Sequence, residues 1–335
     1  MKTLILSGWV LATVLLLGAC RSTGTLEEAS TGIGARGQGV VVESVGGWAL
    51  EKAGIQAGDV LLSWKRLPNP PANPEVAEGV LTSYFEWLEL LEEQAPRGTV
   101  VLGGQRDGEP RKFTVEPGLW ESEVRPVLPP ALEEIYSTGR SYLTSGNIEA
   151  AVRAWSSLVA GAAGEDGRVL RVWIALRIGE TWGEQGDWEK AIESFREALE
   201  AGKSPLAQIV AWAALGDAHE SRNELEAAED AYHSTLKIRQ KLSPESLGVA
   251  SSLRNLGGVA WDCGDLERAQ YYFRRALKIK EKLAPKSLTV ATSLLNLIGC
   301  QGSRQIGPRS RVRHQSSGDP REARPREPRH GDQPE

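Results

Sequence analysis

The chain has 335 residues, of which 41% are hydrophobic and 25% are charged, and its formal net charge is −5. At about 150 residues per domain, this length allows two domains with linkers, and the apolar fraction is enough to form cores. Three cysteines cannot make a disulfide scaffold, and four histidines leave little for a metal cluster. The composition argues against a large metalloenzyme, a multispan membrane protein and a general nucleic-acid binder.

The first twenty residues are predicted to be an export signal. Lys2 precedes the apolar stretch 4–17, which is shorter than the ~20 residues of a membrane-spanning helix. The stretch runs into the letters LGAC at 17–20, which resemble the bacterial lipoprotein box. The resemblance implies that Cys20 is acylated and that Arg21 favours the outer membrane, facing the periplasm. Residues 21–31 are polar and small, and they are predicted to form a tether. An uncleaved anchor, or an ordinary signal that contains a cysteine by chance, stays open.

Residues 32–118 are predicted to form a small, mostly β domain. A β-branched strand at 40–45 precedes a glycine turn, a short helix at 49–53 and a buried strand at 60–62. The letters AGIQAGDVLL, which join this helix to the second strand, resemble bacterial PDZ domains. A later helix, YFEWLELLEE, and a hairpin around its Asp-Gly turn match the rest of that family's order.

PDZ domains bind an extended peptide at a sheet edge, and backbone N–H groups of a glycine loop hold its terminal carboxylate. The resemblance implies that the loop is Gly32, Ile33 and Gly34, and that the pairing strand is Val40, Val41 and Val42. Only four residues separate the loop from Gly39, and an insertion rich in proline follows the second strand. Whether the groove is intact therefore stays open. The paired carboxylates Glu92 and Glu93 are expected on a solvated helix face.

Residues 128–299 contain four copies of one pattern. Its marker glycines are 40, 37 and 41 residues apart, at Gly139, Gly179, Gly216 and Gly257. Each is followed twelve residues later by an alanine (Ala151, Ala191, Ala228, Ala269) and sixteen residues later by an aromatic residue (Trp155, Phe195, Tyr232, Phe273). A period of this length is typical of helical solenoids.

The pattern resembles tetratricopeptide repeats, and the last units resemble the kinesin-light-chain type. The resemblance implies about four helix pairs and the start of a fifth, stacked into a superhelix. The fold class is therefore predicted as multidomain: a small mostly-β, PDZ-like domain followed by an all-α tetratricopeptide solenoid. Helical spacing places the following candidates for peptide binding on or near the concave face: Tyr136, Arg140, Glu180, Asp217, Arg254, Asn255, Trp261 and Asp262. The alternative is that they are solvated polar residues.

Residues 300–335 differ in composition from the repeats. From residue 301 they hold eight arginines and five prolines, and no lysine, leucine or aromatic residue. Two explanations stay open: a disordered basic tail, or a further repeat translated in a shifted frame. The shifted frame is suggested because degenerate back-translation of Ser316 to Pro334 permits a close copy of the repeat that begins at Ala276.

The sequence contains no phosphate-binding loop, nucleophile elbow or zinc-protease motif, and no catalytic residue, cofactor or metal ligand is assigned. We expect a non-enzymatic scaffold at the bacterial cell envelope that binds protein or peptide partners and is tethered to the membrane by lipid. No nucleic acid or small-molecule substrate is expected. The alternative is the regulatory front half of a CHAT caspase-like peptidase, since the order of signal, PDZ-like domain and long repeats resembles such proteins.

Overall fold

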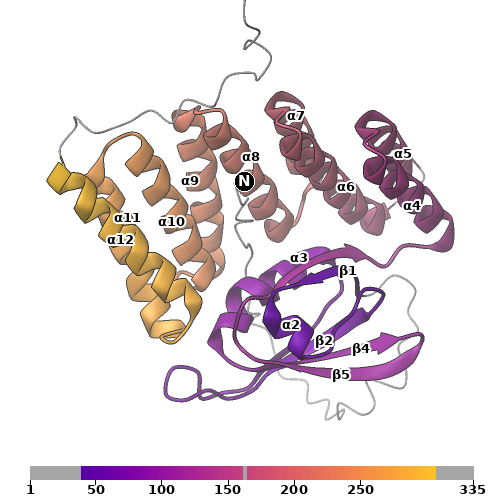
Figure 1. Cartoon of the computed structure of the whole chain (residues 1–335), viewed down its shortest axis with the longest axis horizontal. Helices are drawn as coiled ribbons and strands as arrows, with labels where there is room; N and C mark the ends of the chain where they lie inside the picture. The colour runs from indigo at the N-terminus through magenta and orange to yellow at the C-terminus, as the bar shows by residue number, and fades with distance from the viewer. Residues whose placement is uncertain (1–38, 161–163, 307–335) are drawn as a thin grey trace, which may run out of the picture.

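A computed structural model describes residues 39–160 and 164–306. An antiparallel sheet with its own helices is followed by a row of helices, as the sequence predicts (Figure 1). Predictions for Cys20, for the Gly32–Gly34 loop and for residues 307–335 lie outside the described residues.

The sheet has six strands in the order β5-β4-β2-β1-β6, with β3 paired to one end of β2. Its strands are β1 (Val40–Gly46), β2 (Val60–Arg66), β3 (Ala77–Val80), β4 (Val100–Arg106), β5 (Glu109–Val115) and β6 (Glu121–Pro126). Two helices accompany it, α2 (Trp48–Lys52) and α3 (Tyr84–Glu89), and α3 continues into a π-helical turn, Leu90–Gln94. Between β4 and β5 the predicted hairpin turn is present, with positive φ at Asp107 and Gly108.

Strand β6 shows that two expectations are wrong: the end of the sheet domain at residue 118 and the open edge of the strand at 40–42. It pairs with β1 from Val40↔Pro126 to Gly46↔Glu121, so the sheet extends past residue 118. On its other side β1 pairs with β2, through Val40↔Leu61 and Val41↔Val60. The strand expected to accept a peptide, Val40 to Val42, therefore has a neighbour on each side and offers no open edge.

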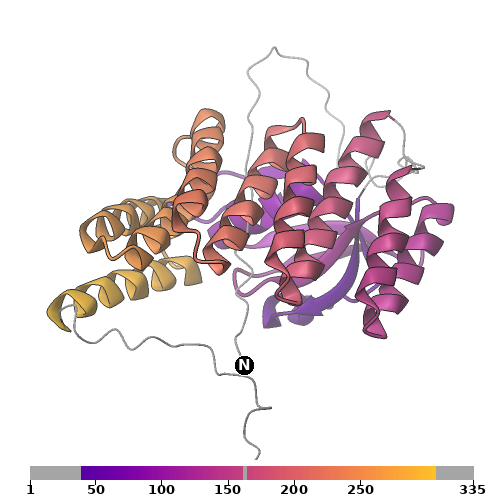
Figure 2. The same ribbon diagram turned by 90° about the horizontal axis from the view of Figure 1, so that it is seen from above.

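Nine helices of the described chain form four pairs and the first helix of a fifth. They are α4 (Pro130–Thr144), α5 (Ile148–Ala160), α6 (Gly164–Glu184), α7 (Trp188–Ala201), α8 (Pro205–Ser221), α9 (Leu225–Leu242), α10 (Leu247–Asp262), α11 (Leu266–Leu283) and α12 (Leu288–Ile306). Figures 1 and 2 show them side by side in chain order. None of the helices within the described ranges has the length and apolar character needed to cross a membrane.

The marker glycines let the two helices of each pair approach closely. A Cβ atom added at Gly139 would lie 2.2 Å from the Trp155 ring, and one at Gly257 would lie 2.5 Å from the Phe273 ring. The other two pairs show the same contact, with Gly179 against Phe195 and Gly216 against Tyr232. The four alanines twelve residues after the glycines are fully buried. The residues that recur in the sequence are therefore those that pack the two helices of each pair together.

Candidate interaction surface between the two domains

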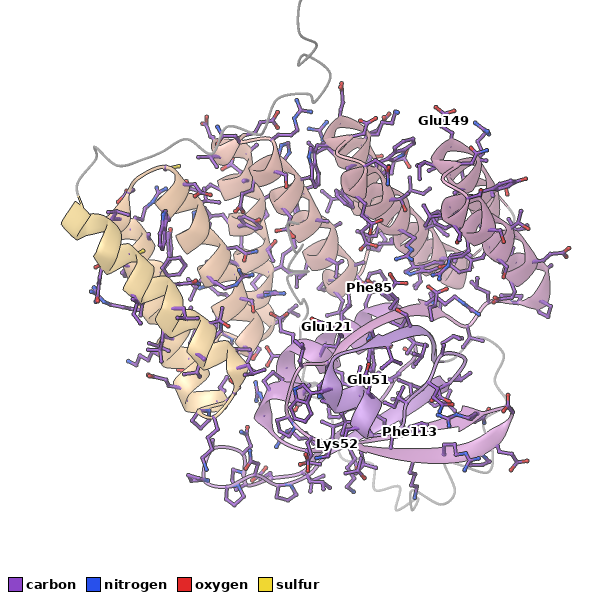
Figure 3. All side chains as sticks on the ribbon, in the orientation of Figure 1. Glu51, Lys52, Phe85, Phe113, Glu121 and Glu149 are labelled. Atoms are coloured by element: carbon purple, nitrogen blue, oxygen red, sulfur yellow. The ribbon has the colours of Figure 1, made fainter. Side chains whose placement is uncertain are left out.

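The sheet domain packs against the first helices of the pairs. Its α3 contacts α8, and the π-helical turn contacts α10. The Phe85 side chain belongs to the hydrophobic core of the solenoid and lies between the two parts of the chain (Figure 3). A further link is the hydrogen bond that Asn73 Nδ2 donates to the carbonyl oxygen of Leu283, at 2.7 Å. Part of the face expected to bind partners is thus covered by the chain's own sheet domain.

A buried ion pair joins the two domains. The Arg239 side chain, at the end of α9, has no exposed surface, and the Glu92 side chain is 3% exposed. Arg239 Nη2 lies 2.8 Å from Glu92 Oε2, and Nη1 lies 3.3 Å from Oε1. Arg239 Nη1 also donates to the carbonyl oxygen of Gly248 and to Ser252 Oγ. The two-point geometry is the one in which guanidinium binds carboxylate most strongly.

Glu93 makes the adjoining contact. Its Oε1 accepts a hydrogen bond of 2.6 Å from the backbone N–H of Gly248, in the first turn of α10, where helix N–H groups lack intrahelical partners. Its Oε2 lies 2.5 Å from Arg97 Nη2. Glu92 and Glu93 therefore bring two negative charges into the interface, and Arg239 and Arg97 balance them. The expectation that these carboxylates lie on a solvated face is wrong, because both are buried between the domains.

Burial and crowded carboxylates shift the pKa values at this junction. Burial lowers the pKa of Arg239, while Glu92 and Glu93 oppose that change. Burial, followed by repulsion from Glu93 and other carboxylates, raises the pKa of Glu89 to about 9. Glu89 is therefore protonated at neutral pH, which removes a third negative charge from the cluster.

A second contact joins β1 to α4. The Tyr136 hydroxyl donates to Glu43 Oε2 at 2.9 Å, and Arg140 Nη1 lies 3.0 Å from the same oxygen. Arg125 lies 3.6 Å from Glu43 and 2.8 Å from Glu133. An open cleft of about 280 Å³ lies here between sheet and solenoid, and these charged groups line it.

The first three predicted concave-face residues thus contact the sheet domain or lie next to it. Tyr136 is buried and stacks on Trp155 with ring centroids 5.8 Å apart. Arg140 pairs with Glu43, as above, and Glu180 lies 3.8 Å from Arg177, which in turn is 3.7 Å from Glu123 of β6. In this conformation, these positions hold the sheet domain in place.

The middle residues belong to α8 and α10, the first helices of the third and fourth pairs. Asp217 accepts a 2.5 Å hydrogen bond from the Tyr232 hydroxyl. Arg254 is partly buried. Burial raises the pKa of the nearby Glu220 carboxyl, and the positive charge of Arg254 opposes that rise. Asn255 is 5% exposed, and its Nδ2 atom has no hydrogen-bond partner within the described chain. The fold therefore leaves the Asn255 amide N–H groups available to donate to a ligand.

Trp261 and Asp262 have different surroundings. Trp261 packs edge-on against Phe273, with centroids 6.4 Å apart, and a Cβ atom at Gly299 of α12 would touch its ring. Its role in the structure is to join α10 to α11 and α12. Asp262 ends α10 and is exposed. The structure does not gather all eight predicted residues into one site.

Comparison with known protein families supports the prediction of tetratricopeptide repeats in the helical part. A family model for tetratricopeptide repeats matches residues 208–282. The helical part contains tetratricopeptide repeats. A search of the curated proteins finds no match.

Three solved structures align with about half of this chain. BtubC (BKLC) from P. vanneervenii aligns at 22% identity and a TM-score of 0.45, over 52% of this chain and 73% of that one. The apo form of RapI aligns at 15% identity and 0.45, over 52% of this chain and 65% of that one. A putative kinesin light chain from P. anserina, with nearly identical TPR-like repeats, aligns at 16% identity and 0.41, over 52% of this chain and 89% of that one.

The family model matches within the repeats, and none of these comparisons identifies the sheet domain or supports the peptidase alternative. Among the residues that the structure describes, no group of three or more His, Cys, Asp or Glu side chains is arranged to hold a metal ion.

Proposed function

We propose that the protein is a non-enzymatic protein-interaction scaffold whose solenoid binds a peptide segment through its inner face, beside the docked sheet domain. One observation carries this proposal. On α10, the buried Asn255 amide has an unused hydrogen-bond donor, next to the charged Arg254 and about two helical turns before Asp262. An asparagine amide beside charged groups suits the backbone carbonyls and side chains of a bound peptide.

A photo-crosslinking amino acid at position 262 tests this surface directly. In cells that produce the full chain, we expect it to link to a discrete protein partner. The matched control places the same amino acid at Gln240, an exposed position on α9, where no link is expected. Replacing Arg254 with alanine should abolish the link at 262 without lowering the unfolding temperature. Equal links at 262 and 240, or a link unaffected by Arg254→Ala, would refute the proposal.

We also propose that this scaffold is held at the bacterial cell envelope by a lipid on Cys20, and that the sheet domain is of the PDZ type. The LGAC sequence supports the anchor, and the order of strands and helices supports the domain type. Cys20→Ala should move the protein from the membrane fraction to the soluble fraction, with Cys263→Ala as the control. Unchanged membrane partition of Cys20→Ala would count against the anchor.

A further inference from the structure

The last helix of the described solenoid has an uncovered apolar stripe. Leu288, Leu295 and Ile298 are 58%, 66% and 62% exposed. Their spacings of seven and three residues place them on one face of α12. Figure 1 shows α12 at one end of the row of helices. From Leu288 to Ser303 the helix contains no charged side chain.

The neighbouring helix carries a basic stripe. On α11, Arg274, Arg275, Lys278 and Lys282 are exposed, and the exposed Lys286 follows in the turn to α12. Between residues 271 and 286 the only exposed acidic side chain is Glu281, while Lys282 also pairs with Glu245. The exposed Tyr271 lies against Arg275, whose guanidinium is 5.4 Å from the ring centroid. In a chain of net charge −5, this helix is a concentrated positive patch.

The two stripes belong to one helical hairpin. Helices α11 and α12 pack directly on each other, and packed helices have axes about 8–10 Å apart. The hairpin therefore carries exposed apolar side chains, basic side chains and a tyrosine on two neighbouring helices. Apolar groups that enter the acyl boundary, flanked by Lys and Arg that contact anionic headgroups, are the features of a membrane-surface helix.

Charge and composition decide between the possible occupants of this face. A second copy of the chain would bring two basic stripes together, and like charges repel. The residues after 306 hold only one valine, and seven arginines against five acidic residues, so they carry neither the apolar groups for the stripe nor a net negative charge for the patch. An anionic lipid surface matches both stripes. We propose that the α11–α12 hairpin is a second membrane contact, which binds bilayers that contain acidic phospholipids.

The test measures partition of the full chain onto two kinds of vesicle, phosphatidylcholine alone and phosphatidylcholine with phosphatidylglycerol. A contribution from the N-terminal apolar stretch or from a lipid on Cys20 would be common to both kinds, so the quantity compared is the ratio of the two partition coefficients. Lys278→Gln with Lys286→Gln should lower this ratio about 25-fold, at about fivefold for each basic side chain. The matched control, Arg196→Gln with Lys203→Gln, removes the same charge from exposed positions of the second repeat and should leave the ratio unchanged.

The apolar stripe is tested separately. Leu295→Gln with Ile298→Gln alters exposed positions and keeps good helix formers, so the fold should persist. This variant should lose the slowing of amide hydrogen exchange in α12 that acidic vesicles produce in the unchanged chain. If both double variants bind acidic vesicles like the unchanged chain, the proposal is wrong. A dimer in solution that Leu295→Gln dissociates, or binding to polyglutamate but not to vesicles, would assign the face to a second copy or to an acidic protein and overturn it.

Discussion

The buried Arg239–Glu92 pair should hold the two domains together, and single substitutions should show this. Arg239→Met removes the cation and leaves Glu92 buried without its counter-charge. Because the two side chains are 0% and 3% exposed, water cannot screen the remaining charge. Removing one partner of such a pair costs about 3–5 kcal/mol, a large part of the 5–15 kcal/mol that stabilises a typical domain.

A double-mutant cycle separates the pair from its surroundings. Glu92→Leu together with Arg239→Met leaves no unpaired charge at this point and keeps apolar volume. The double variant should therefore recover most of the loss that each single variant shows. The free energy of unfolding is measured with urea, and small-angle X-ray scattering reports whether the sheet domain leaves the solenoid in the single variants.

The exposed pair Lys282–Glu245 is the matched control. Its side chains are 64% and 67% exposed, and it lies within the solenoid rather than between domains. Lys282→Met should leave both the urea midpoint and the scattering profile unchanged, because exposed ion pairs contribute little. If Arg239→Met proves as mild as this control, or if the cycle shows no coupling, the ion pair does not hold the domains together.

Two further predictions concern packing and pH. Gly257→Ala should destabilise the solenoid by about 1–3 kcal/mol through contact with Phe273, whereas Gly258→Ala, with no atom within 4 Å of its new Cβ, should stabilise it by about 0.5–1 kcal/mol in thermal unfolding. Because the pKa of Glu89 is raised to about 9, the folded chain keeps a proton that the unfolded chain loses as the pH rises above the ordinary carboxyl range. The urea midpoint should therefore fall between about pH 5 and pH 8, and Glu89→Gln should reduce that slope; an equal slope in both chains would contradict this.

The solenoid could be predicted from sequence because the same packing contact recurs in each repeat. A glycine and an aromatic residue sixteen positions later meet within one helix pair, so the contact is local and the period exposes it. The docking of the sheet domain is different. Arg239 and Glu92 are 147 residues apart and belong to different domains, and no periodic pattern connects them.

The local backbone conformation is a second reason why the sequence did not predict the docking role of Glu92 and Glu93. An α-helix turns adjacent side chains by about 100°, so a pair such as Glu92 and Glu93 reads as part of a solvated face. Here the two carboxylates lie in a π-helical turn, Leu90–Gln94, a rare conformation that the apolar pattern of this segment does not predict. Strand β6 was missed for a related reason. Its pairing with β1 joins residues some 80 positions apart, beyond a boundary that composition suggested at 118.

The repeat period also relates the docking residue Arg239 to an equivalent residue, Lys280, that packs only within the solenoid. Lys280 lies 41 residues after Arg239, and it contacts the Thr289 carbonyl oxygen and Ser293 Oγ as Arg239 contacts Gly248 and Ser252. The last two repeats therefore share a basic side chain bound to the first turn and a half of the next helix, whereas the equivalent position of the second repeat is Gly202. Arg239 pairs with a carboxylate, because the π-helical turn of the sheet domain reaches that pair of helices. Lys280 has no ion pair among the described residues, and burial lowers its pKa to about 8. Of these two related basic sites, the sheet domain docks at the one to which it supplies the Glu92 carboxylate.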